Sequence, residues 1–377
     1  MFKFSEPFRP PIPVDELKSI WESRNSLVGG GTWTKKCENL MSEKFGFEDV
    51  VFTSSCTDAL EMAYTLAEIG PSDNVVVPGF TFVSSVLPAI NLTQDITFCD
   101  VDIHTGVMTY QQLMDCVKDN TKVVVAVNYG GINQEIDKIR DFCFDVGIFL
   151  IEDAAQSIGA KFDGAWYGSF GDVATFSFHD TKNINSGGEG GCLVINNKKY
   201  VERAHILSEK GTNRRDFLTN VVNKYEWLDK GSSHIMADFN AFLLSKNLEY
   251  EPKVTTHRSL LLSRYNSNLK HLNLQFGPEI GNEITSNGHL GYLLLQDKTT
   301  RSKFIEHMEQ VGIQTAVHYP NLARSPYAKR NLSRHSLPNS DVLENRLCRL
   351  PLHFYLSVDN VDVICQHIEE WYLRIAK

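Results

Sequence analysis

The sequence lacks the features that mark a nucleic-acid-binding or membrane-spanning protein. Its formal net charge is −9, so there is no overall excess of basic residues for binding nucleic acid. No apolar run approaches the roughly 18 uninterrupted residues of a membrane-spanning helix. The first residues, MFKFSEPFRPPIPVDEL, place prolines and acids where a secretory signal needs an apolar core. These absences predict a cytoplasmic protein without nucleic-acid or membrane partners.

Two motifs are also missing. The eight cysteines are scattered and no pair has CxxC spacing, so we expect free thiols and no metal site. No GxGxxG follows an early strand, which counts against an NAD-dependent oxidoreductase.

The length and the pattern of the chain predict two domains. The 377 residues exceed the usual limit for one hydrophobic core. Residues 7–13 are rich in proline and predict an extended arm, and helical patterning follows over 15–25 and 33–45. The pattern changes from about residue 237, with a long helix-like stretch that leads into a mixed α/β tail. We expect a large domain over 1–245 and a smaller C-terminal α/β domain over 246–377.

Short apolar runs predict a mainly parallel sheet in the large domain. They lie at 74–77, 96–101, 122–127, 148–151, 173–178 and 191–195. Helix-patterned segments at 84–91, 109–118 and 134–146 separate the first four runs. Runs with little alternation of polarity are typical of strands buried on both faces, and strand–helix repetition indicates a parallel sheet covered by helices.

Ligands of such sheets bind at the carboxyl ends of the strands, and three segments there carry polar residues. The first is SSCTDALEMAYTLAEIG, residues 54–70, where hydroxyl side chains precede residues of helical spacing. A helix start rich in hydroxyl groups can bind an anion, because free N–H groups and the positive end of the helix dipole meet there. Ordinary capping of the helix explains the same pattern and is more common.

The second segment is IFLIEDAAQSIGA, residues 148–160, in which a buried run ends in Glu152 and Asp153. Desolvated carboxylates are costly unless a cation meets them. The alternative is that Asp153 caps a following helix, in whose first turn Gln156 would share its face.

The third segment is FSFHDTKNINSGGEGG, residues 176–191, which places Ser177, His179 and Lys182 after a strand and before four glycines. A lysine in a partly dry pocket becomes a nucleophile towards carbonyl groups, although a lone lysine before glycines is usually structural. Together, an anion site, a strand-end carboxylate and a late lysine are what pyridoxal 5'-phosphate (PLP) requires.

These segments resemble the DegT/StrS-type nucleotide-sugar aminotransferases, and among them the enzymes that make dTDP-4-amino-4,6-dideoxyhexoses. The matching blocks run in order from SEPF near residue 5 to RLPLHFYLS at 349–357, and include SSCTDALEMA, VVVPGFTFVSS, IEDAAQSIGA, SFHDTKN, GGEGG and SEKGTNRRDF. The resemblance implies an α/β aspartate-aminotransferase (type I) fold with a seven-stranded-type sheet. It also implies PLP as the cofactor, a homodimer with active sites at its interface, and L-glutamate as the amino donor.

The resemblance assigns roles residue by residue. Lys182 binds the cofactor through a Schiff base and then moves protons, and Asp153 pairs with the pyridine nitrogen. The remaining cofactor contacts are Gln156 to the ring hydroxyl, Phe82 against the ring face, and Thr57, the amide of Asp58 and Ser177 to the phosphate. Plain core packing is the alternative for Phe82.

Substrate contacts are expected from His179, Arg214, Lys224 and Tyr319. A local hydrogen bond for His179 and simple solvation of Arg214 and Lys224 are the alternatives. The chain departs from the family at three places. Ser233 stands where most members have an Asn that reaches the neighbouring subunit's phosphate, Ile235 replaces an Arg, and HYPNLARSPY lacks the usual histidine.

The sequence therefore predicts a PLP-dependent transfer of the amino group of L-glutamate to a dTDP-4-keto-6-deoxyhexose. The products would be a dTDP-4-amino-4,6-dideoxyhexose and 2-oxoglutarate, for surface polysaccharide or O-antigen synthesis, with pyridoxamine 5'-phosphate as the intermediate cofactor form. The alternatives are amination of a 3-keto sugar nucleotide, or a non-catalytic regulatory protein with the same fold. Lys182 counts against the sugar dehydratases of the family, in which a histidine replaces this lysine.

Overall fold

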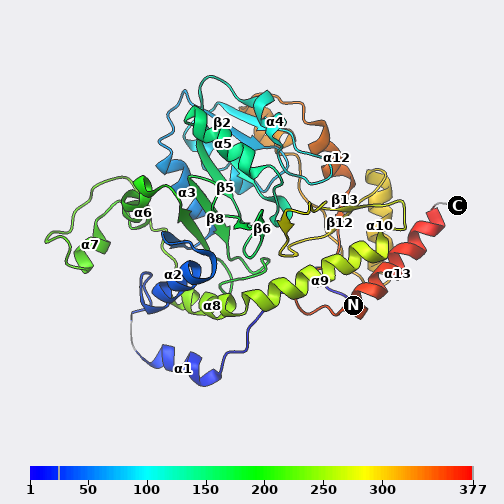
Figure 1. Ribbon diagram of the computed structural model, residues 1–377, viewed down its shortest axis with the longest axis horizontal. Helices are drawn as coiled ribbons and strands as arrows, with labels where there is room; N and C mark the ends of the chain where they lie inside the picture. The colour runs from blue at the N-terminus through cyan, green and yellow to red at the C-terminus, as the bar shows by residue number, and fades with distance from the viewer. Residues whose placement is uncertain (24–25, 376–377) are drawn as a thin grey trace.

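A seven-stranded sheet forms the centre of the protein, whose computed structural model describes residues 1–23 and 26–375 (Figure 1). The strand order is β1-β9-β8-β5-β4-β2-β3. The strands are β1 (Val50–Thr53), β2 (Asn74–Pro78), β3 (Ile96–Cys99), β4 (Thr121–Val127), β5 (Phe149–Asp153), β8 (Val173–Ser177) and β9 (Gly191–Ile195). Only β9 runs against its neighbours in this sheet. The predicted mainly parallel α/β sheet is confirmed.

Both faces of the sheet are buried, which explains why its strands lack alternating polarity. In β2, Val75 and Val77 join one hydrophobic cluster, while Val76 joins another. Because successive side chains point to opposite faces, the two clusters lie on opposite sides of the sheet. Burying each valine stabilises the fold by about 1.5–3 kcal/mol relative to its exposed state.

Helices from the whole N-terminal two thirds of the chain cover these faces. One face packs against α3 (Cys56–Leu66) and α6 (Val201–Ser208). The other packs against α4 (Tyr110–Cys116) and α5 (Ile136–Val146) on one half, and against α2 (Thr32–Phe45) and α8 (Asp238–Glu249) on the other. Helices thus cover both faces of the sheet, which gives three layers.

Two details of the predicted elements are wrong. Residues 84–91 do not form a helix but two short 3-10 turns, Val83–Ser85 and Ala89–Asn91. Pro88 lies between them and has no N–H group to continue a helix. Strand β1 was not among the expected runs. The first helix, α1, spans Val14–Glu22, and the last two residues of the prediction over 15–25 lie outside the described residues.

The C-terminal third has its own small sheet and its own hydrophobic cluster. The sheet order is β10-β12-β13, with β10 at Gln275–Gly277, β12 at Tyr292–Leu294 and β13 at Leu347–Arg349. The helices around it are α9 (Glu251–Leu269), α10 (Lys298–Gln310), α12 (Pro338–Arg346) and α13 (Val358–Ile375). A further sheet joins β11 (Ile284–Thr285) to β6 (Lys161–Phe162) and β7 (Ala165–Trp166). The division near residue 246 stays a prediction.

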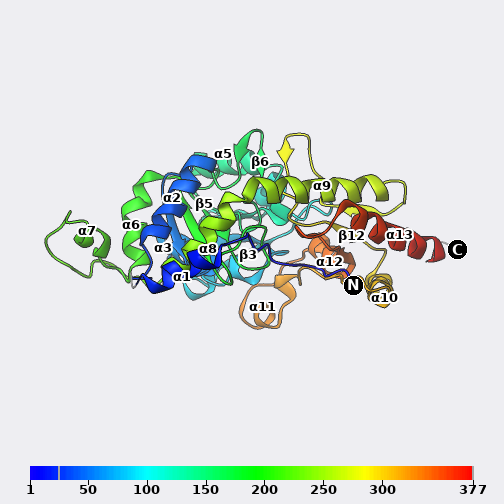
Figure 2. The ribbon, with the colours of Figure 1, turned by 90° about the horizontal axis from the view of Figure 1, so that it is seen from below.

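The N-terminal arm crosses the molecule, as Figure 2 shows in dark blue. Phe2 exchanges backbone hydrogen bonds with Gly312 and Gln314, next to α10. Arg9 reaches the loop after β8, where its guanidinium bonds Asp180 and Asn185. The arm therefore links the C-terminal third to the loop that carries Lys182.

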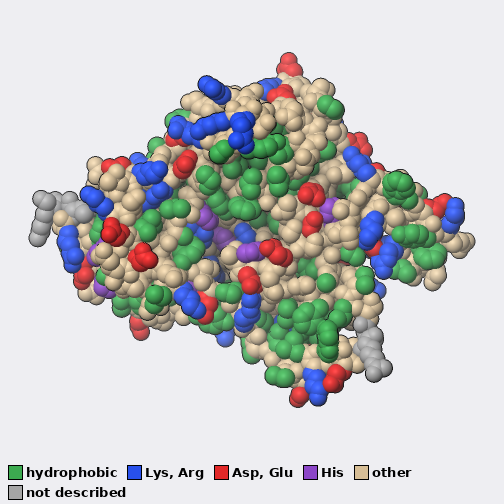
Figure 3. Space-filling view, turned by 180° about the vertical axis from the view of Figure 1, so that it is seen from behind, with side chains coloured by type: hydrophobic (Ala, Val, Ile, Leu, Met, Phe, Trp, Pro, Cys, Tyr) green, Lys and Arg blue, Asp and Glu red, His purple; other side chains and the backbone are tan. Residues whose placement is uncertain are grey.

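Two parts of the surface stand out from the body. The segment with α7 (Arg214–Leu218) projects at the left of Figures 1 and 2. Hydrophobic side chains gather on the lobe with α1 at the bottom of Figure 3, next to the grey residues. The short helix α11 (Pro326–Asn331) also lies at the surface, at the bottom of Figure 2. Within the described ranges, no helix combines the length and the apolar character needed to cross a membrane.

Candidate active site

A cavity of about 620 Å³ lies at the carboxyl edge of the parallel strands. Segments after β1, β2, β4, β5 and β8 meet there, which is where ligands of open α/β sheets bind. Eight of the predicted site residues line it: Thr57, Phe82, Asp153, Gln156, Ser177, His179, Lys182 and Tyr319. The side chains of Asp58, Arg214, Lys224 and Ser233 are not part of its lining.

Asp153 ends β5 and is 5% exposed. One carboxylate oxygen accepts a 2.7 Å hydrogen bond from the hydroxyl of Ser85, and the other accepts from the N–H of Ala155 at 3.2 Å. Burial raises the pKa of Asp153, while these hydrogen bonds and the positive charge of Lys182 oppose the rise. No ion pair joins Asp153 to a cation within 1–23 and 26–375. It is a fixed carboxylate that lacks a cationic partner.

The carboxylates of Glu152 and Asp153 are neighbours in the sequence, but at the end of β5 they lie on opposite faces of the sheet. Because strand residues alternate in direction, Glu152 points away from Asp153. It accepts hydrogen bonds from the N–H groups of Gly168 at 2.7 Å and Phe170 at 2.9 Å, and from the Asn128 amide at 2.8 Å. Glu152 thus fixes the loop before β8, and only Asp153 faces the cavity.

Lys182 follows β8 and lines the cavity beside Cys56. Burial lowers the pKa of Lys182, and the nearby positive charge of Arg349 lowers it further, against the effect of Asp153. Gly187 and Gly188 have φ of 79° and 143°, which side chains rarely tolerate, so they let the loop turn back beside β9. An amine that is more easily deprotonated is suited to attack a carbonyl group or to move a proton.

Hydroxyl groups and a helix start form another end of the cavity. Ser55 caps α3, and Cys56 and Thr57 in its first turn line the cavity. The first turn of a helix leaves N–H groups without intrahelical partners. The Thr57 hydroxyl lies 2.9 Å from the hydroxyl of Ser84, and Ser177 lies at the end of β8. This combination can bind a phosphate.

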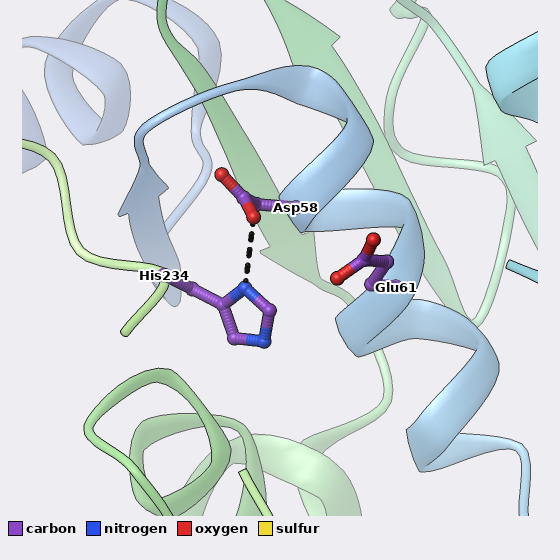
Figure 4. A group of neighbouring side chains, drawn as sticks. All are labelled: Asp58, Glu61 and His234. Atoms are coloured by element: carbon purple, nitrogen blue, oxygen red, sulfur yellow. Dashed lines mark hydrogen bonds and ion pairs between the residues drawn. The ribbon is translucent and has the colours of Figure 1, made fainter. Parts of the chain in front are cut away.

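The predicted phosphate contact of Asp58 has a different environment from that of Thr57. Its N–H donates to the Ser55 hydroxyl at 3.1 Å, and its carboxylate accepts from His234 at 3.1 Å and from the hydroxyls of Ser54 and Ser55. Although burial opposes ionisation, the hydrogen bonds from His234, Ser54 and Ser55 lower the pKa of Asp58. Figure 4 shows Asp58 and Glu61 on α3 with His234 beside them. This contact ties the start of α3 to the segment before α8.

Aromatic rings form one wall of the cavity. Phe82 is 57% exposed, and its ring centroid lies 6.2 Å from that of Tyr319. A large exposed ring that lines a cavity differs from the plain core packing considered for Phe82. Gln156 donates to the Tyr319 hydroxyl at 3.1 Å and accepts from the N–H of Gly130 at 2.7 Å. The residues between β5 and β6 form no helix, so Gln156 is held by these contacts rather than by a helical turn.

The other predicted substrate contacts, and the predicted cofactor contact Ser233, lie at the rim or outside the cavity. His179 bonds Thr181 at 2.8 Å and lies 3.5 Å from Glu189 at the rim. Arg214 pairs with Glu209 at 2.6 Å, and the exposed Lys224 pairs with Glu226 at 2.7 Å. Ser233 forms an isolated bridge with Glu209. Within one chain, Arg214, Lys224 and Ser233 are thus separate from the cavity.

Three residues near the cavity were missed. Ser85 and His318 line it, and Arg349 contacts His318 with a distance of 2.6 Å between Nη1 and Nε2. Ser85 follows Phe82 within the block GFTFVSS, and a buried hydroxyl after a strand was the available signal. His318 and Arg349 carry no local signal, because their meeting depends on the packing of β13 against the segment after α10.

The residues of the cavity fit PLP. Asp153 supplies an unpaired carboxylate for a protonated ring nitrogen, Lys182 an amine for an aldehyde, and the start of α3 donors for a phosphate. The fold and this set of groups define a PLP-dependent aminotransferase of fold type I.

Comparisons with known proteins agree with this class. The model of the DegT/DnrJ/EryC1/StrS aminotransferase family matches residues 14–369. The chain belongs to this family, whose aminotransferases use PLP. The matched range covers almost the whole chain, so the family assignment includes both the large sheet and the C-terminal third.

Individual relatives match over nearly their full length. The dTDP-4-dehydro-2,3,6-trideoxy-D-glucose 4-aminotransferase of Saccharopolyspora spinosa is 28% identical, over 94% of this chain and 93% of that protein. The spore coat polysaccharide biosynthesis protein SpsC of Bacillus subtilis is 27% identical, over 96% and 95%. The crystal structure of the aminotransferase TlmJ from Streptoalloteichus hindustanus has a TM-score of 0.90 and 27% identity, and the match covers 100% of both chains.

Proposed function

We propose that this aminotransferase transfers the amino group of L-glutamate to a dTDP-4-keto-6-deoxyhexose, giving a dTDP-4-amino-4,6-dideoxyhexose and 2-oxoglutarate. The observation that carries the proposal is the single cavity that joins Lys182, Asp153 and the start of α3. The choice of a dTDP-linked 4-keto sugar is supported by the Saccharopolyspora relative, which acts on such a compound by its name.

The residues of the chain divide the work of the reaction. Bound PLP supplies an aldehyde for the donor amine and a ring that withdraws electrons. Asp153 would hold the ring nitrogen protonated, because its carboxylate is fixed by Ser85 and makes no ion pair in the described part of the chain. The Nζ atom of Lys182 takes a proton from the donor carbon and returns one to the acceptor carbon. Phe82 and Tyr319 form one side of the cavity.

The proposal extends to the pathway and the place of action. SpsC serves the synthesis of a spore coat polysaccharide by its name, and we place this enzyme in cytoplasmic synthesis of a surface polysaccharide such as O-antigen. Two alternatives belong to the same fold: amination of a 3-keto sugar nucleotide, and a non-catalytic regulatory role. The complete set of Lys182, Asp153 and Gln156 in one cavity favours catalysis over the regulatory role.

The active form is a homodimer in this proposal. None of the residues of α1 is buried, and Val14 and Trp21 of this helix are 77% and 75% exposed. The projecting segment exposes Val221 and Trp227, at 73% and 80%. Apolar surface of this kind marks an interaction site, and a second copy would cover it. Arg214, Lys224 and Ser233 would then serve the partner's cavity, where Arg214 and Lys224 meet the diphosphate and Ser233 the cofactor phosphate.

Visible absorption of the purified holoenzyme tests the cofactor and the donor. The expected result is a yellow protein that L-glutamate converts to the colourless pyridoxamine form, while Lys182→Ala shows no turnover. Adding a 4-keto sugar nucleotide to the colourless form should restore the colour, and a 3-keto isomer should not. Restoration by the 3-keto compound alone would establish the first alternative, and a protein that never binds PLP would contradict the proposal.

The dimer is tested separately by light scattering coupled to gel filtration. The expected mass is twice the 42.6 kDa of one chain. Trp21→Glu should weaken association. The matched control is Phe144→Glu on α5, because Phe144 is 85% exposed and α5 lies away from α1. A monomer that is fully active would contradict the homodimer.

A further inference from the structure

A second cavity, of about 850 Å³, lies at the edge of the central sheet opposite the active site. Its lining includes the start of β5 and the residues just before β8, whereas the last residues of both strands, Asp153 and Ser177, line the active-site cavity. Helix α3 contributes its end to the second cavity and its start to the active-site cavity. Because the two cavities lie at opposite ends of the same elements, they are separate sites.

Basic side chains gather around the second cavity, although the whole chain has a formal net charge of −9. Four of them line it: Lys122, Arg140, Lys199 and Arg203. The two acidic side chains of the lining are already engaged. Glu68 pairs with Arg203 at 2.7 Å. Asp172 accepts hydrogen bonds from the N–H of Leu150 at 3.0 Å and from the amide of Asn197 at 2.8 Å. The lining therefore keeps an excess of positive charge, which attracts anions.

Three of these cations are free to meet an anion. Among the residues that the structure describes, the ammonium group of Lys122 has no hydrogen-bond or ion-pair partner. Lys199 lies over the ring of Tyr200, 4.5 Å from its centroid, and pairs with no carboxylate of the described chain. Arg140 pairs with Asp141, but that carboxylate side chain is 65% exposed, and surface pairs of this kind contribute little. A phosphate group offers all three cations a stronger, charge-assisted partner.

Aromatic rings form another part of the wall. Phe144, on α5, lines the cavity and is 85% exposed. Phe149 and Tyr200 also line it and meet edge to face, with ring centroids 5.1 Å apart. The exposed face of Phe144 is unfavourable in water and is covered when a flat ring stacks on it. Free cations next to an exposed ring suit a nucleotide, whose base stacks and whose phosphates carry the charge.

We propose that the second cavity binds a nucleoside phosphate. The base stacks on Phe144, and the phosphates meet Lys122, Arg140 and Lys199. The volume of the cavity lies within the range of small-molecule sites, which is about 300–1,000 Å³. A bare anion would leave the rings without a partner, and an uncharged aromatic compound would leave the cations without one. This site is additional to the proposed aminotransferase reaction and does not depend on it.

The nucleoside phosphate is either a free nucleotide or the nucleotide part of a nucleotide sugar, because both present a base and phosphates. Calorimetric titration of the holoenzyme with ADP, with dTDP-glucose and with inorganic pyrophosphate compares these ligands. At least one of the two nucleotides should bind more tightly than pyrophosphate. Tighter binding of ADP would identify the ligand as a free nucleotide, and tighter binding of dTDP-glucose would identify it as a nucleotide sugar.

Variants of Lys122 and Phe144 assign the binding to this cavity. Lys122→Met should weaken binding of the preferred nucleotide by about 10- to 100-fold, the range for a lost hydrogen bond to a charged group, and Lys122→Arg should recover part of the affinity. Phe144→Ala should weaken it by about 5- to 100-fold, the range for a lost stacking contact, without changing the binding of pyrophosphate. Lys303→Met is the matched control, because Lys303 is an exposed lysine of α10 that lines neither cavity.

Two further measurements separate this role from a catalytic or structural one. Lys122 and Phe144 lie outside the active-site cavity, so bleaching of both variants by L-glutamate without added nucleotide should keep the wild-type rate. Both side chains are exposed, so the midpoints of urea unfolding should also stay unchanged.

Two results would overturn the inference while leaving the proposed function in place. One is the absence of nucleotide binding, or nucleotide binding that neither Lys122→Met nor Phe144→Ala weakens, which would assign it to the active site. The other is binding of pyrophosphate as tight as that of either nucleotide, which would leave a site for anions without recognition of a base. Failure of the proposed function is a different result: the wild-type protein would then bind no PLP or accept an amine from no amino acid.

Discussion

The hydroxyl of Ser85 donates a 2.7 Å hydrogen bond to the carboxylate of Asp153. The two residues lie 68 positions apart, in the turn after β2 and at the end of β5. The Ser85 hydroxyl also lies 2.9 Å from the hydroxyl of Thr81. Because Ser85 gives its own proton to Asp153, it accepts the hydrogen bond from Thr81. The turn that was predicted as a helix thus serves to orient the carboxylate of the active site.

Asp153→Asn should slow the glutamate half-reaction by about 10²- to 10³-fold. The variant keeps the shape of the side chain but leaves a protonated ring nitrogen without its buried counter-charge. Stopped-flow absorbance of the bleaching step measures the effect. Ser85→Ala should give a smaller loss, because it removes only a hydrogen bond that holds down the pKa of Asp153. Equal rates for Asp153→Asn and the wild type would exclude the assigned role.

Lys182→Met should stabilise the cofactor-free protein in a pH-dependent way. Burial lowers the pKa of Lys182 below its ordinary value of 10.5. Between the lowered value and 10.5 the unfolded chain binds more protons, so the free energy of unfolding of the wild type rises with pH. The advantage of Lys182→Met should therefore be largest at low pH and shrink towards pH 10.5.

Urea unfolding of the two cofactor-free proteins at several pH values measures this difference. Lys253→Met, at an exposed lysine of α9, is the control and should show no such trend. An advantage of Lys182→Met that grows with pH would contradict the lowered pKa.

Thr57→Ala should weaken the binding of PLP by about 10- to 100-fold. The variant removes a hydroxyl at the start of α3, and a hydrogen bond to a charged group contributes about 1.5–3 kcal/mol. The control is Thr65→Ala on the same helix, whose hydroxyl bonds the carbonyl of Glu61 outside the cavity. Fluorescence titration of the cofactor-free variants with PLP gives both affinities, and a matching loss in Thr65→Ala would remove the phosphate role from Thr57.

Glu152→Ala should lower the free energy of unfolding by about 2–4 kcal/mol. Glu152 is fully buried, and its loss leaves the N–H groups of Gly168 and Phe170 without an acceptor. Glu48→Ala removes an exposed carboxylate that pairs with Lys198, and should change stability by less than about 1 kcal/mol. Urea unfolding of the cofactor-free proteins measures both, and equal stabilities would contradict the structural role of Glu152.

The sequence predicted the sheet well because its signals are local. The runs that became β2 and β4 each contain three consecutive valines, and the run of β5 begins with IFLI. Such uninterrupted apolar runs are favourable only when both faces are covered. The run of β1, VVFT, carries the same β-branched signal but was overlooked beside the hydroxyls that follow it. The helix over 84–91 was wrong because apolar spacing was weighed without Pro88.

The site could be predicted only in part. Lys182, Asp153 and Thr57 each follow a strand, so topology alone brings them to one edge of the sheet. The pair of His318 and Arg349 depends instead on how the C-terminal third packs against that edge. Local sequence patterns carry no information about such packing. The family resemblance therefore includes the segment that begins at Arg349 but assigns no role to His318 or Arg349.

The N-terminal arm has a consequence for synthesis on the ribosome, where the N-terminus emerges first. The guanidinium of Arg9 bonds Asp180 in the loop of Lys182, and the N–H of Arg9 donates to the hydroxyl of Tyr355 at 3.0 Å. The N–H of Leu352 donates to the carbonyl of Phe4. Residues of the arm are thus synthesised long before Leu352 and Tyr355, the residues that anchor them. The support that the arm gives to the active-site loop is complete only after residue 355 has been synthesised.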